Sequence, residues 1–298
     1  MKTKVINIDT SINSLINSGQ QFTIIETSLS CELICKYGKF YWSENNNLKL
    51  HELGFIRQVW NYAQKLPIPK KVEREKIKYI DFRRNFNKEI NCYEIDLKSA
   101  YWEMAFRNGF ISKKIYEKGK SEKISKLARL VALGNLAKVK YHLFFNGNDY
   151  EFQGTTESEM KDMFFKCCLD TSEIMQNLKF LVNENFLFYW VDAIFVNSKD
   201  AMMNVCEYLD FQNLPYKVKF LPEIICNEKY IEVKQEDEKI KPKIYCKLKN
   251  NQRTPINKLL NLAKLKKDIE EYERRINNFR NASNEKIYKR GEISENFF

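Results

Sequence analysis

Apolar and polar residues recur along this chain at two different spacings, which predict an interleaved series of helices and strands. Apolar residues three to four positions apart predict helices over residues 12–18, 50–64, 125–139, 157–183 and 198–210, and one that ends near residue 108. Runs rich in β-branched and aromatic residues predict strands over 21–29, 31–37, 39–43, 77–82, 93–96, 217–227, 229–235 and 241–248. The apolar stretch 186–196 predicts a central antiparallel hairpin. The predicted fold class is therefore α+β.

The chain shows few internal boundaries. It has only 9 Gly and 6 Pro and no low-complexity linker, which favours one compact unit with appendages, with a division into lobes as the alternative. We expect an N-terminal α+β region over residues 1–85 and a central domain over 86–250, with inserted helices at about 110–140. A long charged amphipathic pattern predicts a basic helical region over 251–298.

Composition adds that the chain folds around a substantial core. Its 298 residues are 44% hydrophobic and 14% aromatic, too apolar for a disordered chain. No uninterrupted apolar run is long enough to span a membrane, and the first 20 residues lack the apolar core of a signal peptide. We expect a cytoplasmic protein with no membrane partner.

The eight cysteines are scattered without a CxxC pair, and only two histidines accompany them. Zinc sites usually require tighter clustering, so we expect reduced, mostly buried thiols. Cys31 and Cys35 are the one pair close enough in sequence to consider further.

The positive charge is unevenly placed. The formal net charge is +11, and residues 241–298 hold 15 Lys or Arg against 7 Asp or Glu, which gives +8 from this segment alone. A localised basic surface gains affinity for phosphates by releasing counterions, which favours a polyanionic partner. A solvated helix in a lysine-rich protein remains the alternative.

Two aspartates stand where apolar strands end. Asp96 closes a strand within NCYEIDLKSAYWEMAFR, and Asp192 interrupts the apolar run FLFYWVDAIFV. Each has an ordinary explanation, Asp96 as a helix N-cap and Asp192 as part of a hairpin turn formed with Ala193. If the two strands are neighbours in one sheet, however, both carboxylates reach the same edge and can hold two divalent cations between them.

The segment Asp96-Leu97-Lys98-Ser99-Ala100-Tyr101 resembles the first catalytic signature of the family B DNA polymerases, in which aspartate is followed by two variable residues, serine, a small residue and tyrosine. The resemblance implies that Asp96 binds both metal ions and that the Leu97 carbonyl binds one. It also implies that Tyr101 packs beneath the sugar and excludes a 2′-hydroxyl. Lys98 and Ser99 would face the triphosphate.

The other family signatures are matched more loosely. The hairpin signature places Asp192 on the essential second aspartate and Trp190 where the first is expected. The middle signature is represented by residues 129–137, with Arg129 in place of its lysine. Lys123 and Lys126 precede this segment, and with Arg129 they recur every third residue. These three cations would lie on one side of a helix and grip the triphosphate, with a solvated helix face as the alternative.

The resemblance also implies contacts with nucleic acid. Gly134 would let a base pair approach the backbone. The residues Lys241, Lys243 and Tyr245 resemble the family's Lys-Lys-x-Tyr region, which contacts the primer strand.

The resemblance covers roughly residues 85–250 and implies a polymerase-type palm, an antiparallel sheet backed by helices. Short helical fingers and a thumb-like C-terminal helical region would complete it. The implied activity is template-directed addition of dNTPs to a DNA 3′ end of a primer–template, with two Mg²⁺ or Mn²⁺ ions, as in DNA replication. The composition and the short chain favour a virus or mobile element as the source. About 90 upstream residues are too few for a proofreading exonuclease.

Three alternatives stay open. The first is a reverse-transcriptase-like or primase-like polymerase, with RNA as a further template. The second is a catalytically degenerate palm that acts as a nucleic-acid-binding subunit, which Trp190 favours. The third is an unrelated α+β binding protein whose aspartates are a cap and a turn.

Overall fold

The chain divides into two compact units. The computed structural model describes residues 3–4, 8–27, 30–43, 48–83, 86–227, 230–237 and 240–246. The first unit takes its described residues from Met1–Arg57 and Gly134–Lys161, and the second from Gln58–Leu133 and Asp162–Pro255. Each contains a largely or wholly antiparallel sheet, which confirms the α+β class.

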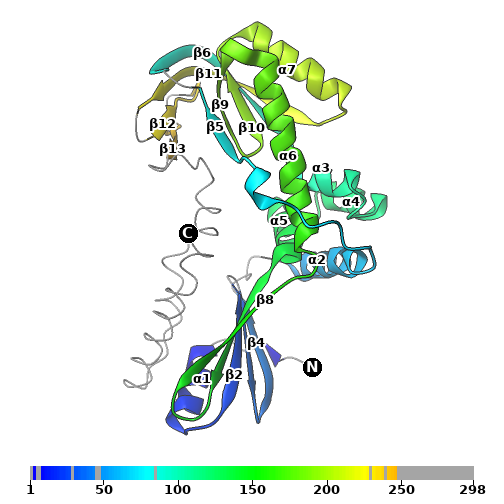
Figure 1. Ribbon diagram of the computed structural model, residues 1–298, viewed down its shortest axis with the longest axis vertical. Helices are drawn as coiled ribbons and strands as arrows, with labels where there is room; N and C mark the ends of the chain where they lie inside the picture. Colours follow the sequence, from blue (N-terminus) through cyan, green and yellow to red (C-terminus); the bar gives the residue numbers. More distant parts are fainter. Residues whose placement is uncertain are drawn as a thin grey trace. The chain divides into compact units, whose positions relative to one another are not determined.

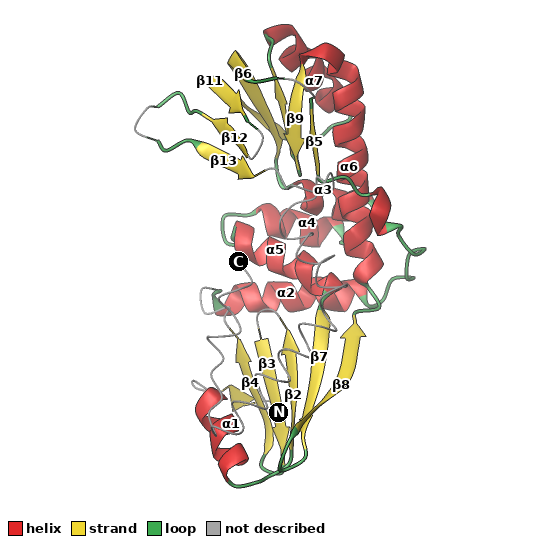
Figure 2. Cartoon of the chain, turned by 60° about the vertical axis from the view of Figure 1, so that its left-hand side comes forward, coloured by secondary structure: helices red, strands yellow, loops and turns green. Residues whose placement is uncertain are grey.

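The first unit is a six-stranded sheet with one helix against it (Figures 1 and 2). The strand order is β1-β4-β3-β2-β7-β8, and only the β1–β4 pair is parallel. The elements are β1 (Thr3–Lys4), α1 (Ile8–Asn17), β2 (Phe22–Thr27), β3 (Ser30–Cys35), β4 (Gly38–Ser43), β7 (Val139–Phe145) and β8 (Tyr150–Glu157).

The core of this unit follows from the alternation of its strands. On β2, Phe22 and Ile24 are buried while Thr23 and Ile25 are partly exposed, as expected for a sheet with one covered face. Ile12 and Leu15, one helical turn apart on α1, pack into the same cluster. Helix and sheet thereby share one apolar layer.

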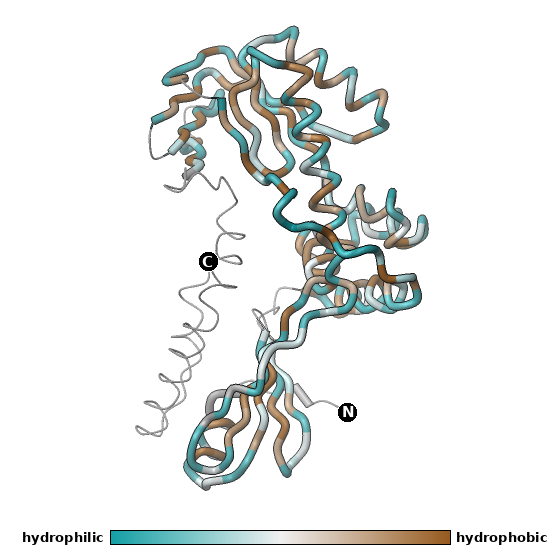
Figure 3. Tube along the Cα trace, in the orientation of Figure 1, coloured by the Kyte–Doolittle hydropathy of each residue, from teal (hydrophilic) through white to brown (hydrophobic). Residues whose placement is uncertain are grey.

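The second unit is built on a seven-stranded antiparallel sheet. Its order is β13-β12-β11-β6-β10-β9-β5, so β6 lies at the centre between β11 and β10. The strands are β5 (Ile80–Phe82), β6 (Lys88–Leu97), β9 (Phe186–Trp190), β10 (Ala193–Val196), β11 (Tyr216–Cys226), β12 (Tyr230–Val233) and β13 (Lys243–Cys246). The apolar residues of these strands show as brown segments of the tube in Figure 3.

Helices α6 and α7 cover one face of this sheet, and α3 to α5 follow β6 along the chain (Figure 1). The helices are α3 (Ala100–Arg107), α4 (Lys113–Lys120), α5 (Lys126–Gly134), α6 (Lys161–Val182) and α7 (Lys199–Phe211), and α2 (Leu50–Ala63) crosses the division between the units. Three short 3₁₀ turns lie at Arg74–Lys76, Asn135–Ala137 and Asn183–Asn185. Helix α6 is joined to β5 by an ion pair between Lys179 and Asp81 (2.7 Å).

The structure differs from the expected organisation at two places. Residues 1–85 are not one region, because β5 belongs to the sheet of the second unit and the hairpin β7–β8 joins the first. The helix expected over 125–139 ends at Gly134, and Val139 already belongs to β7. The hairpin itself was not predicted. The helical region expected over 251–298 lies outside the described residues.

None of the described helices is long and apolar enough to cross a membrane. Seven cysteines in the described part carry free thiols, and five of these are buried, as expected. Cys31 and Cys35 both lie on β3, where Cys31 is part of the apolar core.

Candidate active site

Asp96 and Asp192 are brought together by adjacent strands. Asp96 lies on β6 directly opposite Ala193 of β10, so Asp192 is one residue beyond this pair. The N–H of Leu97 donates to the carbonyl of Asp192 at 2.9 Å, which extends the ladder to the aspartate itself. Asp96 and Asp192 therefore lie on or next to neighbouring strands, which is the arrangement that the predicted pair of carboxylates requires.

The hairpin that carries Asp192 has a strained turn. Trp190 pairs with Ala193, which leaves Val191 and Asp192 as the turn residues, rather than Asp192 and Ala193 as the turn alternative held. Val191 has φ of +59°, a conformation that costs free energy for a β-branched residue. Its N–H donates to the carbonyl of Tyr79 at 2.6 Å, so the adjoining segment holds the turn in place.

Burial and mutual repulsion raise the pKa of Asp192 to about 6. Removal from water is the larger cause, and the negative charge of Asp96 is the next. The pKa of Asp96 is also raised, first by burial and then by Glu94, while Lys126, Lys217 and Lys243 oppose the shift. A cation held between the two carboxylates would offset the repulsion between their charges.

Glu94 is a third acidic residue on the same face of β6 and was missed by the sequence reasoning. It precedes Asp96 by two positions, so both side chains point to one side of the sheet. Glu94 is buried, and its carboxylate is paired with the ammonium group of Lys243 at 3.1 Å. The alternation of Glu94 and Asp96 within one predicted strand was the available signal.

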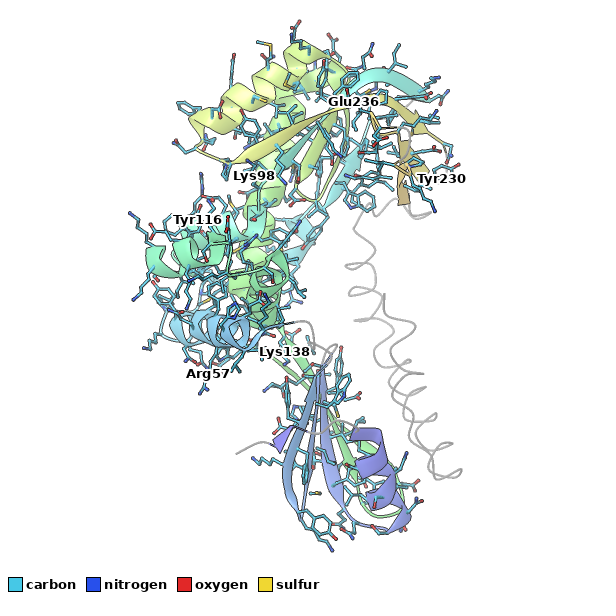
Figure 4. The ribbon with its side chains drawn as sticks, turned by 180° about the vertical axis from the view of Figure 1, so that it is seen from behind. Arg57, Lys98, Tyr116, Lys138, Tyr230 and Glu236 are labelled. Carbon is cyan, nitrogen blue, oxygen red and sulfur yellow. The ribbon has the colours of Figure 1, made fainter. Side chains whose placement is uncertain are left out.

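The segment after Asp96 shows that this aspartate is not a helix cap. Asp96 lies within β6, and the N-cap position of α3 is occupied by Ser99, whose φ is +56°. The Ser99 carbonyl accepts the N–H groups of Trp102 and Glu103, which starts the helix. Lys98, labelled in Figure 4, is exposed between the strand and the helix.

Tyr101 lies in the first turn of α3 and is partly buried beside α6. Its ring meets that of Phe164 edge to face, with centroids 5.8 Å apart. The hydroxyl contacts the thiol of Cys168, and burial together with Cys168, Tyr79 and Asp192 raises its pKa well above the usual value. The tyrosine that the resemblance assigns to sugar selection thus lies near Asp192.

The three predicted phosphate-binding cations have different surroundings. Lys126 begins α5 and is exposed, yet it acts electrostatically on both Asp96 and Asp192. Lys123 is exposed in the turn before α5, so the three cations do not share one helix.

Arg129 is partly buried on α5. Its guanidinium donates to the carbonyls of Gly119 (2.7 Å) and Ile124 (3.2 Å) and approaches the Ser99 hydroxyl (3.4 Å). Burial lowers its pKa. These contacts tie the start of α5 to the turn that follows Asp96.

The residues predicted to contact nucleic acid lie at the end of α5 and on or just before β13. Gly134 ends α5, and no atom lies within 4 Å of the position where a Cβ would stand, so its backbone is open. Lys241 is exposed, and Lys243 is held by Glu94. Tyr245 packs against Trp190 with ring centroids 5.0 Å apart, and its pKa is raised by burial and by the three carboxylates.

The donor set suits a hard cation. Asp96 and Asp192 offer carboxylate oxygens, the ligands that Mg²⁺ and Mn²⁺ prefer. In the described part of the chain no three His, Cys, Asp or Glu side chains are gathered closely enough to form a complete metal site. A divalent ion bound here would therefore draw further ligands from water, from a substrate phosphate or from a backbone carbonyl such as that of Leu97.

A search of protein families finds none that matches this chain, and a search of curated proteins finds no match.

Proposed function

We propose that this chain is a nucleotidyltransferase with a polymerase-type palm, which adds dNTPs to a DNA 3′ end by phosphoryl transfer assisted by two Mg²⁺ or Mn²⁺ ions. The observation that supports this most strongly is the position of Asp96 and Asp192 on adjacent antiparallel strands, joined by the hydrogen bond from Leu97 to the Asp192 carbonyl. Such a pair at one sheet edge has the oxygen ligands that phosphoryl transfer requires.

The arrangement of the remaining elements agrees with this proposal. An antiparallel sheet with helices on one face carries both aspartates, and the short helices α3 to α5 follow the first of them (Figure 2). In a palm, these short helices would serve as the fingers. Lys126 on α5 acts electrostatically on both carboxylates. In the proposed complex it would also attract the negative charge of a substrate triphosphate.

Each residue has a defined role in the proposed reaction. Asp96 and Asp192 would hold the cations, which supply charge neutralisation at the attacking and leaving oxygens. Lys126 stabilises the negative charge that develops on the departing pyrophosphate. Tyr101 lies against Phe164 and forms a rigid wall where the sugar of the nucleotide would rest. Arg129 keeps Ser99 and the start of α5 in fixed positions.

The direct test is incorporation of labelled dNTPs with Mg²⁺ or Mn²⁺ on primed DNA, on primed RNA and without primer. We expect incorporation on primed DNA by the wild type and none by Asp96→Asn or Asp192→Asn. Asp200→Asn, an exposed aspartate of α7, is the matched control and should remain active. Activity that survives in both site variants would eliminate the mechanism.

A second function is favoured by one contact. Trp190 stands where the resemblance expects a carboxylate, and it packs against Tyr245 with ring centroids 5.0 Å apart. A palm that has exchanged a carboxylate for an aromatic contact can persist as a nucleic-acid-binding subunit. DNA binding without incorporation under any metal would favour this role.

A further inference from the structure

Two lysines on β11 lie beside the carboxylates and have no role in the chemistry described above. Lys217 is directly opposite Asp96 in the β6–β11 ladder, and Lys219 is directly opposite Glu94. Side chains of directly opposed residues point to the same face of an antiparallel sheet. Both ammonium groups therefore extend from the carboxylate face, and both residues are exposed.

Lys217 is one of three lysines that act on Asp96. Lys126, Lys217 and Lys243 act on Asp96 from three different elements, and each lowers its pKa. Lys243 is paired with Glu94 at 3.1 Å. Within the described residues, no hydrogen bond or ion pair holds the ammonium group of Lys217, so it can bind an external anion.

Lys219 is fixed in place by the protein. Its ammonium group donates to the side-chain carbonyl of Gln235 at 2.6 Å, and Gln235 is buried. A single hydrogen bond leaves two of the three N–H donors of Lys219 available to a ligand. The side chain is thus positioned before any ligand arrives.

The spacing of the two lysines matches a repeating polyanion. Residues two positions apart on a strand are about 7 Å apart, which is comparable with the separation of successive phosphates in a polynucleotide. The row begins opposite Asp96 and continues along β11 away from it. A strand whose end lies at Asp96 would therefore pass along this row.

We propose that Lys217 and Lys219 bind successive phosphates of the DNA strand whose 3′ end is extended at Asp96. This inference rests on the proposed function, because it takes the position of that 3′ end from it. The contact is electrostatic, so it adds affinity without reading the base sequence.

Equilibrium binding of a fluorescently labelled primer–template tests this surface without any need for catalysis. The variant Lys217→Gln/Lys219→Gln is compared with wild type by fluorescence anisotropy over a series of salt concentrations. Each duplex phosphate contact contributes roughly 0.9 to the slope of log affinity against log salt, so the magnitude of that slope should fall by about 2. The loss should be the same for primers of different sequence.

The control variant Lys70→Gln/Lys199→Gln removes the same charge from two exposed lysines outside this row, and its slope should equal that of wild type. A slope in Lys217→Gln/Lys219→Gln that equals the control's would overturn the inference, even if wild type incorporates dNTPs. Binding that depends on the two lysines in a protein that incorporates nothing would support this surface and contradict the proposed catalysis.

Discussion

The N–H of Leu97 donates a 2.9 Å hydrogen bond to the carbonyl of Asp192, which joins the end of β6 to the turn between β9 and β10. The two aspartates are 96 positions apart in sequence. This bond nevertheless brings them together where the strands β6 and β10 meet the turn. The strained Val191 and its bond to Tyr79 fix the turn from the other side. A rigid backbone beneath two carboxylates is what a cation site requires.

The raised pKa of Asp192 predicts a pH-dependent stability. Its pKa is 3.8 ordinarily and about 6 in the folded protein, so between these values the folded state binds more protons than the unfolded state. Ionisation of Asp192 therefore lowers the free energy of unfolding as pH rises through this window. The side chain introduced by Asp192→Asn cannot ionise, so the free energy of unfolding of this variant should exceed that of wild type by up to about 3 kcal/mol above pH 6. This figure follows from about 1.4 kcal/mol for each pKa unit.

Urea unfolding of the apoprotein at pH values from 4 to 7.5 measures this difference. The gain of Asp192→Asn over wild type should grow steadily with pH and level off above pH 6. A difference that is constant across the range would show that the charge of Asp192 carries no such cost.

Gly119 of α4 occupies a position where we expect no side chain to be tolerated. A Cβ there would lie 2.4 Å from the ring of Trp102, which is fully buried. Gly119→Ala should lower the free energy of unfolding by about 1–3 kcal/mol, because the ring has no room to move. Gly134→Ala is the control, since its Cβ would meet no atom within 4 Å, and it should leave stability unchanged or slightly increased. Equal stability of the two variants would contradict the packing described for α3 and α4.

We expect Tyr101 to determine the preference of the proposed enzyme for dNTPs over NTPs. Tyr101→Ala removes the wall beneath the nucleotide, so the ratio of kcat/KM for dNTPs to that for NTPs should fall at least about tenfold. Tyr93→Ala is the control, because Tyr93 lies on the opposite face of β6 and packs against Phe220. The proposed role of Tyr101 fails if its variant keeps the wild-type ratio.

The sequence predicted most elements of the second unit, because its periodic signals are strong. The alternating and apolar runs gave β9, β10 and β11, and the helical spacing gave α6 and α7. The hairpin β7–β8 was missed because the apolar residues before it continue the helical spacing of α5 as far as Val139. The composition of the two units was missed for the same reason, since this hairpin pairs with β2, more than 100 positions earlier.

The candidate site was predicted in part. The pairing of Asp96 with the hairpin followed from two local signals, a strand end and a charge in an apolar run. Glu94 could have been assigned from its alternation with Asp96 on one strand. Lys217 could not be assigned, because its closeness to Asp96 depends on which strand lies beside β6 and in which register. Strand order is set by the packing of the whole sheet, which local periodicity does not encode.

Binding of Mn²⁺, followed by the loss of the electron paramagnetic resonance signal of the free ion in the presence of a dNTP, tests the proposed cation site most directly. Wild type and the control Asp200→Asn should take up Mn²⁺ with equal affinity, while Asp96→Asn and Asp192→Asn should each bind it much more weakly. Equal Mn²⁺ affinity in all four proteins would contradict a cation site formed by Asp96 and Asp192.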